Sequence, residues 1–270
     1  MRGLLLCALL AALPCAARAE IPLSLSGQAA EGGLMLGKTA PGAHVTLDGA
    51  AVRVSAAGDF LLGFGRDAAG TKRLEVMHGA ERTARDIVVA DRTFKIERIN
   101  GLPGKKVTPD PKSLQRIAAE KAEINKARER SEAGTFYLSG FRWPATGRIS
   151  GVYGSQRVLN GKPRRPHYGT DIAAPTGTRV GAVAAGRVAF VHPGMFFNGK
   201  TVLIDHGLGL RSVYIHLSQT SVKAGDTVTA GQDIGAIGAT GRATGPHLHF
   251  GLTLDAIPID PELVLGDMPE

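Results

Sequence analysis

Alternating apolar and polar positions dominate residues 34–89 of this chain. Apolar residues two positions apart recur there, as at Val45 and Leu47, and turn-forming pairs such as Pro41-Gly42 separate them. A period of two is the pattern of strands with one buried face. Short strands joined by close turns predict a small antiparallel β-sandwich of the immunoglobulin-like kind, which we assign to residues 20–98.

The period changes to that of a helix after a proline-containing stretch. Residues 101–111 contain three prolines and are typical of a linker, with Asp110 as a helix N-cap and Pro111 as the first helical residue. We therefore assign residues 99–140 to a linker and an amphipathic helix that continues to about Glu132. Whether its apolar stripe packs on either domain, or covers a site in the second one, stays open. The stripe consists of Leu114, Ile117, Ala118 and Ile124.

From residue 141 onward, glycine-rich turns alternate with apolar strands. Two stretches with similar spacing of glycine and valine, which begin at Gly177 and Gly225, resemble a weak internal repeat. We predict a mainly all-β protein whose C-terminal part, residues 141–270, is an antiparallel barrel-sandwich hybrid. The predicted strands span residues 180–191, 201–205, 210–217, 222–228 and 234–237.

The first nineteen residues have the order of a secretory signal peptide. Arg2 precedes ten apolar residues, 4–13, and the small-x-small sequence Ala17-Arg18-Ala19 follows them. Ten apolar residues are too few for the roughly 20 that a membrane-spanning helix needs. We therefore expect cleavage after Ala19, export to the periplasm or cell envelope, and no transmembrane segment.

Composition narrows the classes of function. Hydrophobic residues make up 43% of the 270 residues and charged residues 21%, which excludes a multi-span membrane protein and a wholly disordered chain. The two cysteines lie within the predicted signal peptide, so the exported chain has no disulfide. Without Arg2 and Arg18 of the predicted signal peptide, 30 basic and 24 acidic residues leave a net charge of +6, which suits an anionic envelope surface or wall polymer. Export argues against nucleic acid as a partner.

Histidines concentrate in the C-terminal part, in two close pairings. In His167-Tyr168-Gly169-Thr170-Asp171, an imidazole and a carboxylate lie four residues apart, and Gly169 lets the chain bend closely. In His247-Leu248-His249, strand alternation places both imidazoles on one face. Catalytic zinc takes three protein ligands and leaves a fourth position for water. His167, Asp171 and one histidine of the second pairing would complete that set, and His216 lies on another predicted strand.

Taken together, these motifs resemble the LytM/lysostaphin-like zinc metalloendopeptidases, which hydrolyse peptide bonds in peptidoglycan. The resemblance covers roughly residues 145–255, and includes Ser150-Gly151-Val152-Tyr153-Gly154, the Asp205-His206-Gly207 turn and Gly245-Pro246-His247-Leu248-His249-Phe250. It does not cover the N-terminal half of the chain. It implies Zn²⁺ as the cofactor and the peptide stems of peptidoglycan as the substrate.

Position by position, the resemblance places the zinc ligands on His167, Asp171 and His249. It places the catalytic histidine pair on His216 and His247. This pair would orient water, stabilise the oxyanion and pass a proton to the leaving amine. No member of the set is missing, which separates this chain from relatives of the family that have lost ligands.

Two other classes of function remain as alternatives. One is a catalytically silent envelope regulator that activates another cell-wall hydrolase, against which the full ligand set argues. The other is a lipoyl- or biotinyl-type carrier, suggested by the glycine-turn pattern of residues 222–238. A carrier needs a lysine at a hairpin tip, whereas Lys223 opens a predicted strand. The bond cleaved, the role of the N-terminal domain, the oligomeric state and autoinhibition by residues 101–140 are not determined.

Several other polar residues have simpler interpretations. We expect a structural hydrogen-bonding role for His206 and a loop position for His192. Tyr214 could line the substrate site, as could Asn198, or either could be a packing residue. The basic run Lys162-Pro163-Arg164-Arg165 could meet substrate carboxylates, although a solvated loop is the simpler interpretation.

Overall fold

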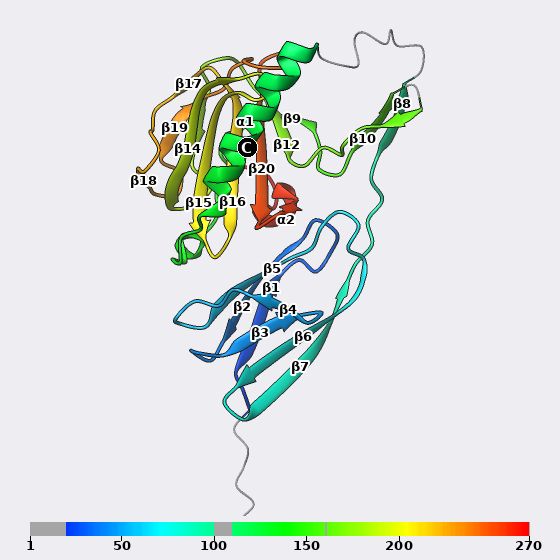
Figure 1. The fold of residues 1–270 in the computed structure, drawn as a ribbon, viewed down its shortest axis with the longest axis vertical. Helices are drawn as coiled ribbons and strands as arrows, with labels where there is room; N and C mark the ends of the chain where they lie inside the picture. Colours follow the sequence, from blue (N-terminus) through cyan, green and yellow to red (C-terminus); the bar gives the residue numbers. More distant parts are fainter. Residues whose placement is uncertain (1–19, 100–109, 160, 270) are drawn as a thin grey trace, which may run out of the picture.

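The computed structural model describes residues 20–99, 110–159 and 161–269 (Figure 1). The predicted signal peptide, residues 1–19, and most of the predicted linker lie outside the described residues. The described chain forms two β units, one above the other in Figure 1, with a long helix beside the upper unit. This arrangement confirms the predicted mainly all-β fold class.

The N-terminal unit is a sandwich of two antiparallel sheets. Leu74 and Val76 are fully buried while their neighbours on the strand are more exposed, as the period of two requires. These residues pack with Phe60 and Leu62 from the opposing sheet. One sheet has the order β1(Leu23–Gly27), β2(Leu34–Thr39), β5(Asp59–Gly63), and the other has the order β4(Ala50–Val52), β3(His44–Leu47), β6(Gly70–His78), β7(Glu81–Val89).

A large antiparallel sheet and a smaller one enclose the core of the C-terminal unit. Tyr214, Phe250 and Ile172 are fully buried between them. The large sheet has the order β18(Thr227–Val228), β14(Gly186–Met195), β15(Gly199–Gly207), β16(Leu210–Leu217), β20(Leu248–Leu254), β12(Thr170–Ala173), β9(Arg148–Gly151), and β21(Ile257–Ile259) also pairs with β20. The small sheet has the order β13(Arg179–Gly181), β19(Asp233–Ala236), β17(Gln219–Thr220).

Two predicted strands are wrong in extent. The strand expected over residues 180–191 is two elements, because β13 ends at Gly181 and β14 begins at Gly186. The buried residues between them carry the chain from the small sheet to the large one. Of the strand expected over residues 222–228, only Thr227–Val228 is extended within the large sheet. Apolar composition alone did not distinguish a buried crossover from a strand.

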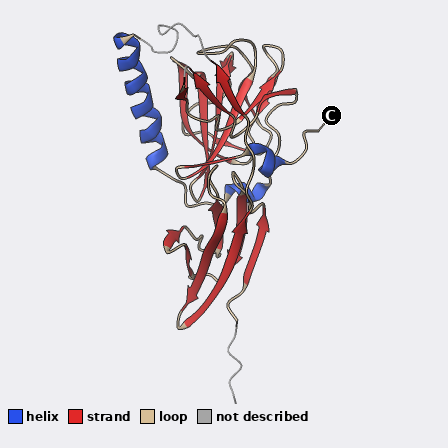
Figure 2. Ribbon diagram, turned by 90° about the vertical axis from the view of Figure 1, so that its right-hand side faces the viewer, coloured by secondary structure: helices blue, strands red, loops and turns tan. Residues whose placement is uncertain are grey.

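Helix α1(Pro111–Glu129) follows the linker, and a short α2(Pro261–Leu265) follows the last strand. The Asp110 carboxylate accepts a hydrogen bond from the Ser113 amide, which caps α1 as its sequence predicts. Of the predicted apolar stripe, Ile124 is buried against Met195 and Leu203, whereas Leu114 is 47% exposed. The helix therefore packs on the large sheet of the C-terminal unit, along one side of it in Figure 2.

Helix α1 lies on one face of the large sheet, which we call the outer face. Val213 of β16 packs against the cluster that holds the helix. Ile215, two residues along the same strand, points to the same face, and it lies directly opposite His249 of β20. His249 in turn lies opposite Asp171 of β12. The outer face thus carries both the helix and two of the three predicted zinc ligands.

Hydrogen bonds and one strand pairing join the two units. Arg92 of the N-terminal unit donates to the Asp260 carboxylate at 2.8 Å, and the Asp260 amide donates to the Gly32 carbonyl oxygen at 2.7 Å. The Nε–H of Arg66 in the N-terminal unit donates to the Gly154 carbonyl oxygen at 2.8 Å. Strand β8(Ile96–Ile99) leaves the sandwich and pairs in parallel with β10(Gln156–Leu159), which also pairs with β11(Lys162–Pro163).

Candidate metal centre and histidine pair

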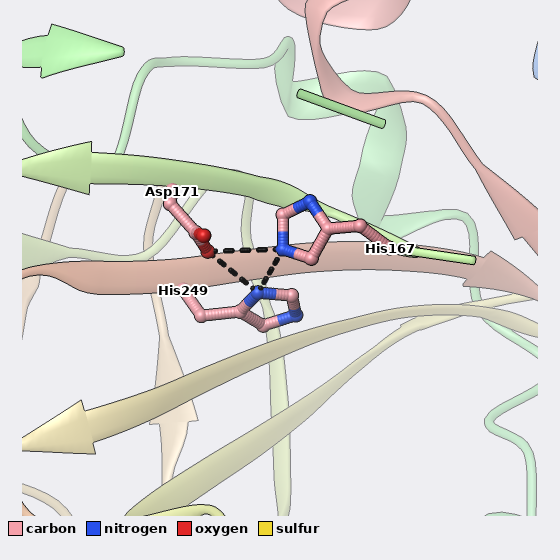
Figure 3. A group of neighbouring side chains, drawn as sticks. All are labelled: His167, Asp171 and His249. Carbon is pink, nitrogen blue, oxygen red and sulfur yellow. Dashed lines mark hydrogen bonds and ion pairs between the residues drawn. The ribbon is translucent and has the colours of Figure 1, made fainter. Parts of the chain in front are cut away.

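Three side chains from separate elements converge at the outer face (Figure 3). The Nε2 atom of His167 lies 3.0 Å from Oδ1 of Asp171 and 2.8 Å from Nδ1 of His249. Nδ1 of His249 lies 2.8 Å from the same carboxylate oxygen. One atom of each side chain therefore forms a triangle small enough to surround a single ion. We call these three residues the site cluster.

Strand pairing and one glycine bring the site cluster together. Asp171 and His249 are direct neighbours across β12 and β20. His167 precedes β12, and the chain between it and Asp171 passes closely over β20 at Gly169. A Cβ atom on Gly169 would lie 2.8 Å from the His249 ring, well inside van der Waals contact. Glycine at this position therefore permits the close approach that the sequence predicts.

Hydrogen bonds and burial around the site cluster determine the tautomer of His167 and the pKa values of Asp171 and His249. His167 donates its Nδ1–H to the carbonyl oxygen of Val152 at 3.0 Å, so in a neutral imidazole its Nε2 lone pair points into the cluster. Burial alone would raise the pKa of the Asp171 carboxyl, but contacts with His167 and His249 outweigh it and hold that pKa well below its usual range. Burial lowers the pKa of His249.

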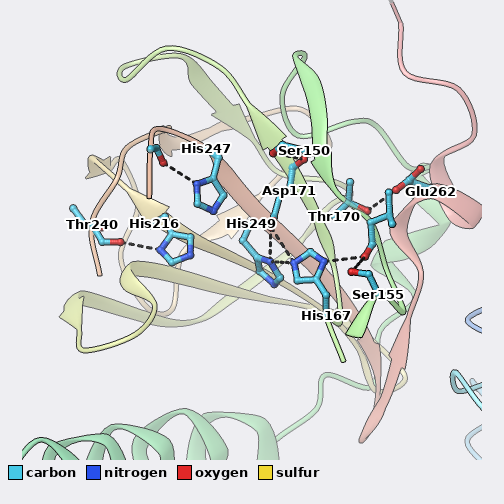
Figure 4. A network of polar contacts seen from close by, with 12 residues as sticks. Ser150, Ser155, His167, Thr170, Asp171, His216, Thr240, His247, His249 and Glu262 are labelled. Atoms are coloured by element: carbon cyan, nitrogen blue, oxygen red, sulfur yellow. Dashed lines mark hydrogen bonds and ion pairs between the residues drawn. The ribbon is translucent and has the colours of Figure 1, made fainter. Parts of the chain in front are cut away.

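A second pair of histidines lies beside the site cluster (Figure 4). The ring centroids of His216 and His247 are 4.7 Å apart, with 50° between the ring planes. His216 donates its Nδ1–H to the Thr240 carbonyl oxygen at 2.8 Å, and His247 donates its own to the Gly245 carbonyl oxygen at 2.9 Å. Each neutral imidazole thus keeps Nε2 as its lone-pair atom. We call these two residues the histidine pair.

His216 has an unusual backbone and environment. Its φ angle is +65°, a conformation that residues with a side chain rarely adopt. Its amide donates to the Asn198 carbonyl oxygen at 2.7 Å, which holds the residue in place at the end of β16. Burial lowers the pKa of His216 to about 4, so its imidazole is neutral at pH 7.

The part of the chain that carries these histidines is similar to a known protein family. Residues 165–261 match peptidase family M23. A solved structure described as a peptidase M23 from Pseudomonas aeruginosa is 30% identical, covers 88% of this chain and 96% of its own, and superposes with a TM-score of 0.67. The chain belongs to peptidase family M23. The predicted resemblance to LytM/lysostaphin-like peptidases is thereby confirmed, and the solved M23 structure extends over the N-terminal unit as well.

Curated M23 relatives match the C-terminal unit. Peptidoglycan DD-endopeptidase ShyB of Vibrio cholerae is 42% identical over 106 residues, which are 38% of this chain and 24% of the relative. DD-carboxypeptidase/endopeptidase Mpg of Neisseria meningitidis is 42% identical over 107 residues, which are 39% and 24% of the two chains. The M23 chain thus spans about a quarter of the length of these curated relatives.

None of the helices within the described residues of this M23 protein is long and apolar enough to cross a membrane. The export signal predicted over residues 1–19 is outside the described residues.

The other histidines and the tyrosine considered in the sequence lie in different parts of the M23 fold. His206 is fully buried, with its ring nitrogens 2.7 Å from the Ala185 carbonyl oxygen and 2.7 Å from the Ser212 hydroxyl, so its structural role is confirmed. Tyr214 is also fully buried, and its hydroxyl accepts from the Val183 amide at 2.8 Å, so it is a packing residue. His192 lies in β14, and its predicted loop position was wrong.

The error at His192 has a local cause. Pro193-Gly194 follows it and is typical of a turn, but the register shifts between His192 and Met195. This irregularity lets β14 continue to Met195 opposite Gly199. The carbonyl groups that orient the site histidines, at Val152, Thr240 and Gly245, were also missed, because any residue supplies a carbonyl and its identity leaves no signal.

Proposed function

We propose that this M23 protein is an exported zinc endopeptidase that hydrolyses peptide cross-links of peptidoglycan. The observation that carries the proposal is the convergence of His167, Asp171 and His249 with a second histidine pair beside them. Relatives named as peptidoglycan DD-endopeptidases support the substrate class. The signal-like residues 1–19 support export to the periplasm or envelope.

The donor set of the site cluster fits zinc. Two imidazole nitrogens and one carboxylate oxygen are ligands that zinc prefers, and three protein ligands are typical of a catalytic zinc site. With the His167 Nδ1–H donated to Val152, the lone pair of Nε2 faces a carboxylate oxygen that is 3.0 Å away. Two such electron-rich atoms repel each other unless a proton or a cation lies between them. The Val152 carbonyl also orients the His167 ring, as an outer partner of a metal ligand does.

A zinc ion held there would act as a Lewis acid, acidifying a water molecule and polarising the scissile carbonyl. The rest of the chemistry belongs to side chains of the protein. His216 is neutral at pH 7 and presents Nε2, so it can accept a proton from the attacking water. His247, whose ring lies beside that of His216, can stabilise the oxyanion and donate a proton to the leaving amine when its Nε2 atom carries a proton.

The proposed function gives each of the three parts of the chain a role. Residues 141–270 form the peptidase domain, residues 20–98 an accessory β-sandwich, and residues 99–140 the linker and helix. Helix α1 packs against Met195 and Leu203, and the side chains of His167 and Asp171 remain 23% exposed and that of His249 16% exposed. This exposure argues against autoinhibition by the helix.

A wall-digestion assay tests the proposal. Purified protein lacking residues 1–19 is incubated with peptidoglycan sacculi, with a chelator, and with a chelator followed by added zinc. We expect soluble fragments with newly freed peptide ends in the first and third reactions only. Release of nothing by zinc-loaded protein, together with stimulation of a separate wall hydrolase, would instead support the alternative of a catalytically silent regulator.

A further inference from the structure

Glu120 is a buried carboxylate on a helix whose other charged side chains are mostly exposed. Along residues 111–129, all of which the structure describes, the buried residues are Glu120 and Ile124. Ile124 packs against the apolar Met195 and Leu203, as a buried apolar residue should. A buried carboxylate instead needs hydrogen-bonding partners that replace the lost water. The partners of Glu120 therefore indicate which part of the protein this side of α1 holds.

Each carboxylate oxygen of Glu120 accepts one hydrogen bond. Oε2 accepts from the Phe196 amide at 2.8 Å, and Oε1 accepts from the Nε–H of Arg116 at 2.7 Å. Arg116 also donates from Nη2 to the Gly194 carbonyl oxygen at 2.7 Å. Helix α1 thus holds the end of β14 through both of the residues that flank Met195.

Residues 196–198 connect β14 to β15, and we call them the β14–β15 turn. The Asn198 carbonyl oxygen accepts from the His216 amide at 2.7 Å. The amide that Glu120 holds, at Phe196, is only two residues before that carbonyl. A short stretch of backbone therefore connects a side chain of α1 with one member of the histidine pair.

The same turn also supports the ring of His216. The Nδ1–H of that ring donates to the Thr240 carbonyl oxygen (Figure 4). The Thr240 hydroxyl accepts from the Lys200 amide at 2.9 Å, next to the turn. Two residues after Thr240, the Arg242 amide donates to the Phe197 carbonyl oxygen at 2.9 Å. Both the backbone and the imidazole of His216 are thus held through this turn and the strand that follows it.

His216 needs such support because of its backbone conformation. Its φ angle of +65° costs free energy in a residue with a side chain, so it persists only where surrounding contacts hold it. The pairing of β15 with β16 is irregular there, because the register shifts between the partners of Tyr214 and Leu217. The hydrogen bond to Asn198 takes the place of a regular strand pairing at His216.

We propose that Glu120 is a positioning residue for His216, because it holds the Phe196 amide and thereby the β14–β15 turn on which His216 rests. The inference rests on the proposed function, in which His216 accepts a proton from the attacking water. It extends the catalytic unit from residues 165–261, which match the M23 family, to a helix that precedes them. Proton transfer requires the acceptor to lie within hydrogen-bond reach, so a displaced imidazole slows the reaction without releasing zinc.

Two conservative variants separate reach from charge at this position. Glu120→Gln keeps the length of the side chain and one oxygen for the Phe196 amide, but removes the charge. Glu120→Asp keeps the charge, but is one methylene shorter. Both are measured on zinc-loaded protein lacking residues 1–19, with a cross-linked stem-peptide dimer. We expect kcat to fall about tenfold or more in Glu120→Asp and less than about threefold in Glu120→Gln, with KM and zinc content unchanged.

Glu123→Gln is the matched control. Glu123 lies on the same helix and is exposed, and its carboxylate is 3.9 Å from Nε2 of His192 on β14. We expect this variant to keep the kcat of the unaltered protein. A merely structural role for Glu120 would lower the unfolding free energy of Glu120→Asp and leave its kcat unchanged. That result, or a fall in kcat for Glu120→Gln as large as for Glu120→Asp, would overturn the proposal.

Hydrogen exchange at the His216 amide makes the outcome independent of turnover. The amide is followed by NMR in zinc-loaded protein with ¹⁵N-labelled histidine, and it is assigned by the signal that His216→Gln lacks. Its exchange rate reports how often the bond to Asn198 opens. We expect exchange about tenfold faster or more in Glu120→Asp, and no change in Glu123→Gln.

The two proposals can therefore fail separately. Protein that cleaves no dimer, but whose Glu120→Asp variant exchanges the His216 amide faster, would refute the peptidase and support the contact from α1. Protein that cleaves the dimer, and whose Glu120→Asp variant keeps both kcat and slow exchange, would support the peptidase and refute the positioning role.

Discussion

The buried His206 and the site cluster place histidines on opposite faces of the same sheet. Burial lowers the pKa of both His206 and His249, so the direction of the pKa shift does not separate them. Their partners do: His206 has a carbonyl oxygen and a hydroxyl at its two nitrogens, whereas Nδ1 of His249 faces a carboxylate and a second imidazole. A histidine whose nitrogens meet ordinary hydrogen-bonding partners is structural, and one whose lone pairs converge with others is a candidate ligand.

The largest effect is expected from removing a member of the site cluster. His167→Ala deletes one of three converging donor atoms, so we expect loss of bound zinc and a fall in wall hydrolysis of about a thousandfold or more. His206→Gln, on the other face, should retain zinc. Elemental analysis and release of wall fragments measure the two effects. Full zinc content in His167→Ala would contradict the assignment.

A variant of the histidine pair tests whether metal binding and proton transfer belong to different residues of the outer face. His247→Ala removes a proton-transfer group but no cluster donor, so we expect zinc to be retained and kcat to fall by about a hundredfold to ten-thousandfold. The measurement is metal content together with turnover of a cross-linked peptide. If the metal is lost as completely as in His167→Ala, His247 belongs with the ligands and the division between the cluster and the pair is wrong.

Protonation of His206 should lower the stability of the protein in mild acid. Burial lowers the pKa of His206 to about 4, against an ordinary value of 6.5. Between these values the unfolded chain binds more protons, so the free energy of unfolding falls as the pH drops from 6.5 towards 4. For one histidine this amounts to about 2 kcal/mol between pH 7 and pH 5.

Urea unfolding of His206→Gln at both pH values isolates that contribution. The variant starts from a lower stability, because a buried network that includes Ser212 and Ala185 is altered. Its loss of stability between pH 7 and pH 5 should nevertheless be smaller than that of the unaltered protein, by about 2 kcal/mol. Equal losses would mean that His206 titrates normally and is accessible to solvent.

Local patterns in the sequence account for much of the fold and for the convergence at the site. Strand alternation predicts that His247 and His249 share a face, and the capping signal at Asp110 predicts where α1 begins. The hydrogen bond from Arg211 to the Arg130 carbonyl oxygen was not predicted, because the two residues are distant in sequence and meet only when α1 packs on the sheet. The division of residues 180–191 between two sheets was missed for the same reason, since it depends on tertiary pairing.

The smallest effect on stability is expected from a substitution of His192, which has fewer hydrogen-bonding partners than His206. Its Nδ1 atom accepts one hydrogen bond, from the Gly194 amide at 3.0 Å, and its Nε2 atom lies 3.9 Å from a carboxylate oxygen of the exposed Glu123. A partly exposed side chain with one bond contributes little, so His192→Gln should cost less than about 1 kcal/mol in unfolding free energy. Zinc content should be unchanged. A loss of unfolding free energy as large as that in His206→Gln would contradict this expectation. The two histidines would then be equivalent despite their different surroundings, and the number of hydrogen-bonding partners would not distinguish a structural histidine.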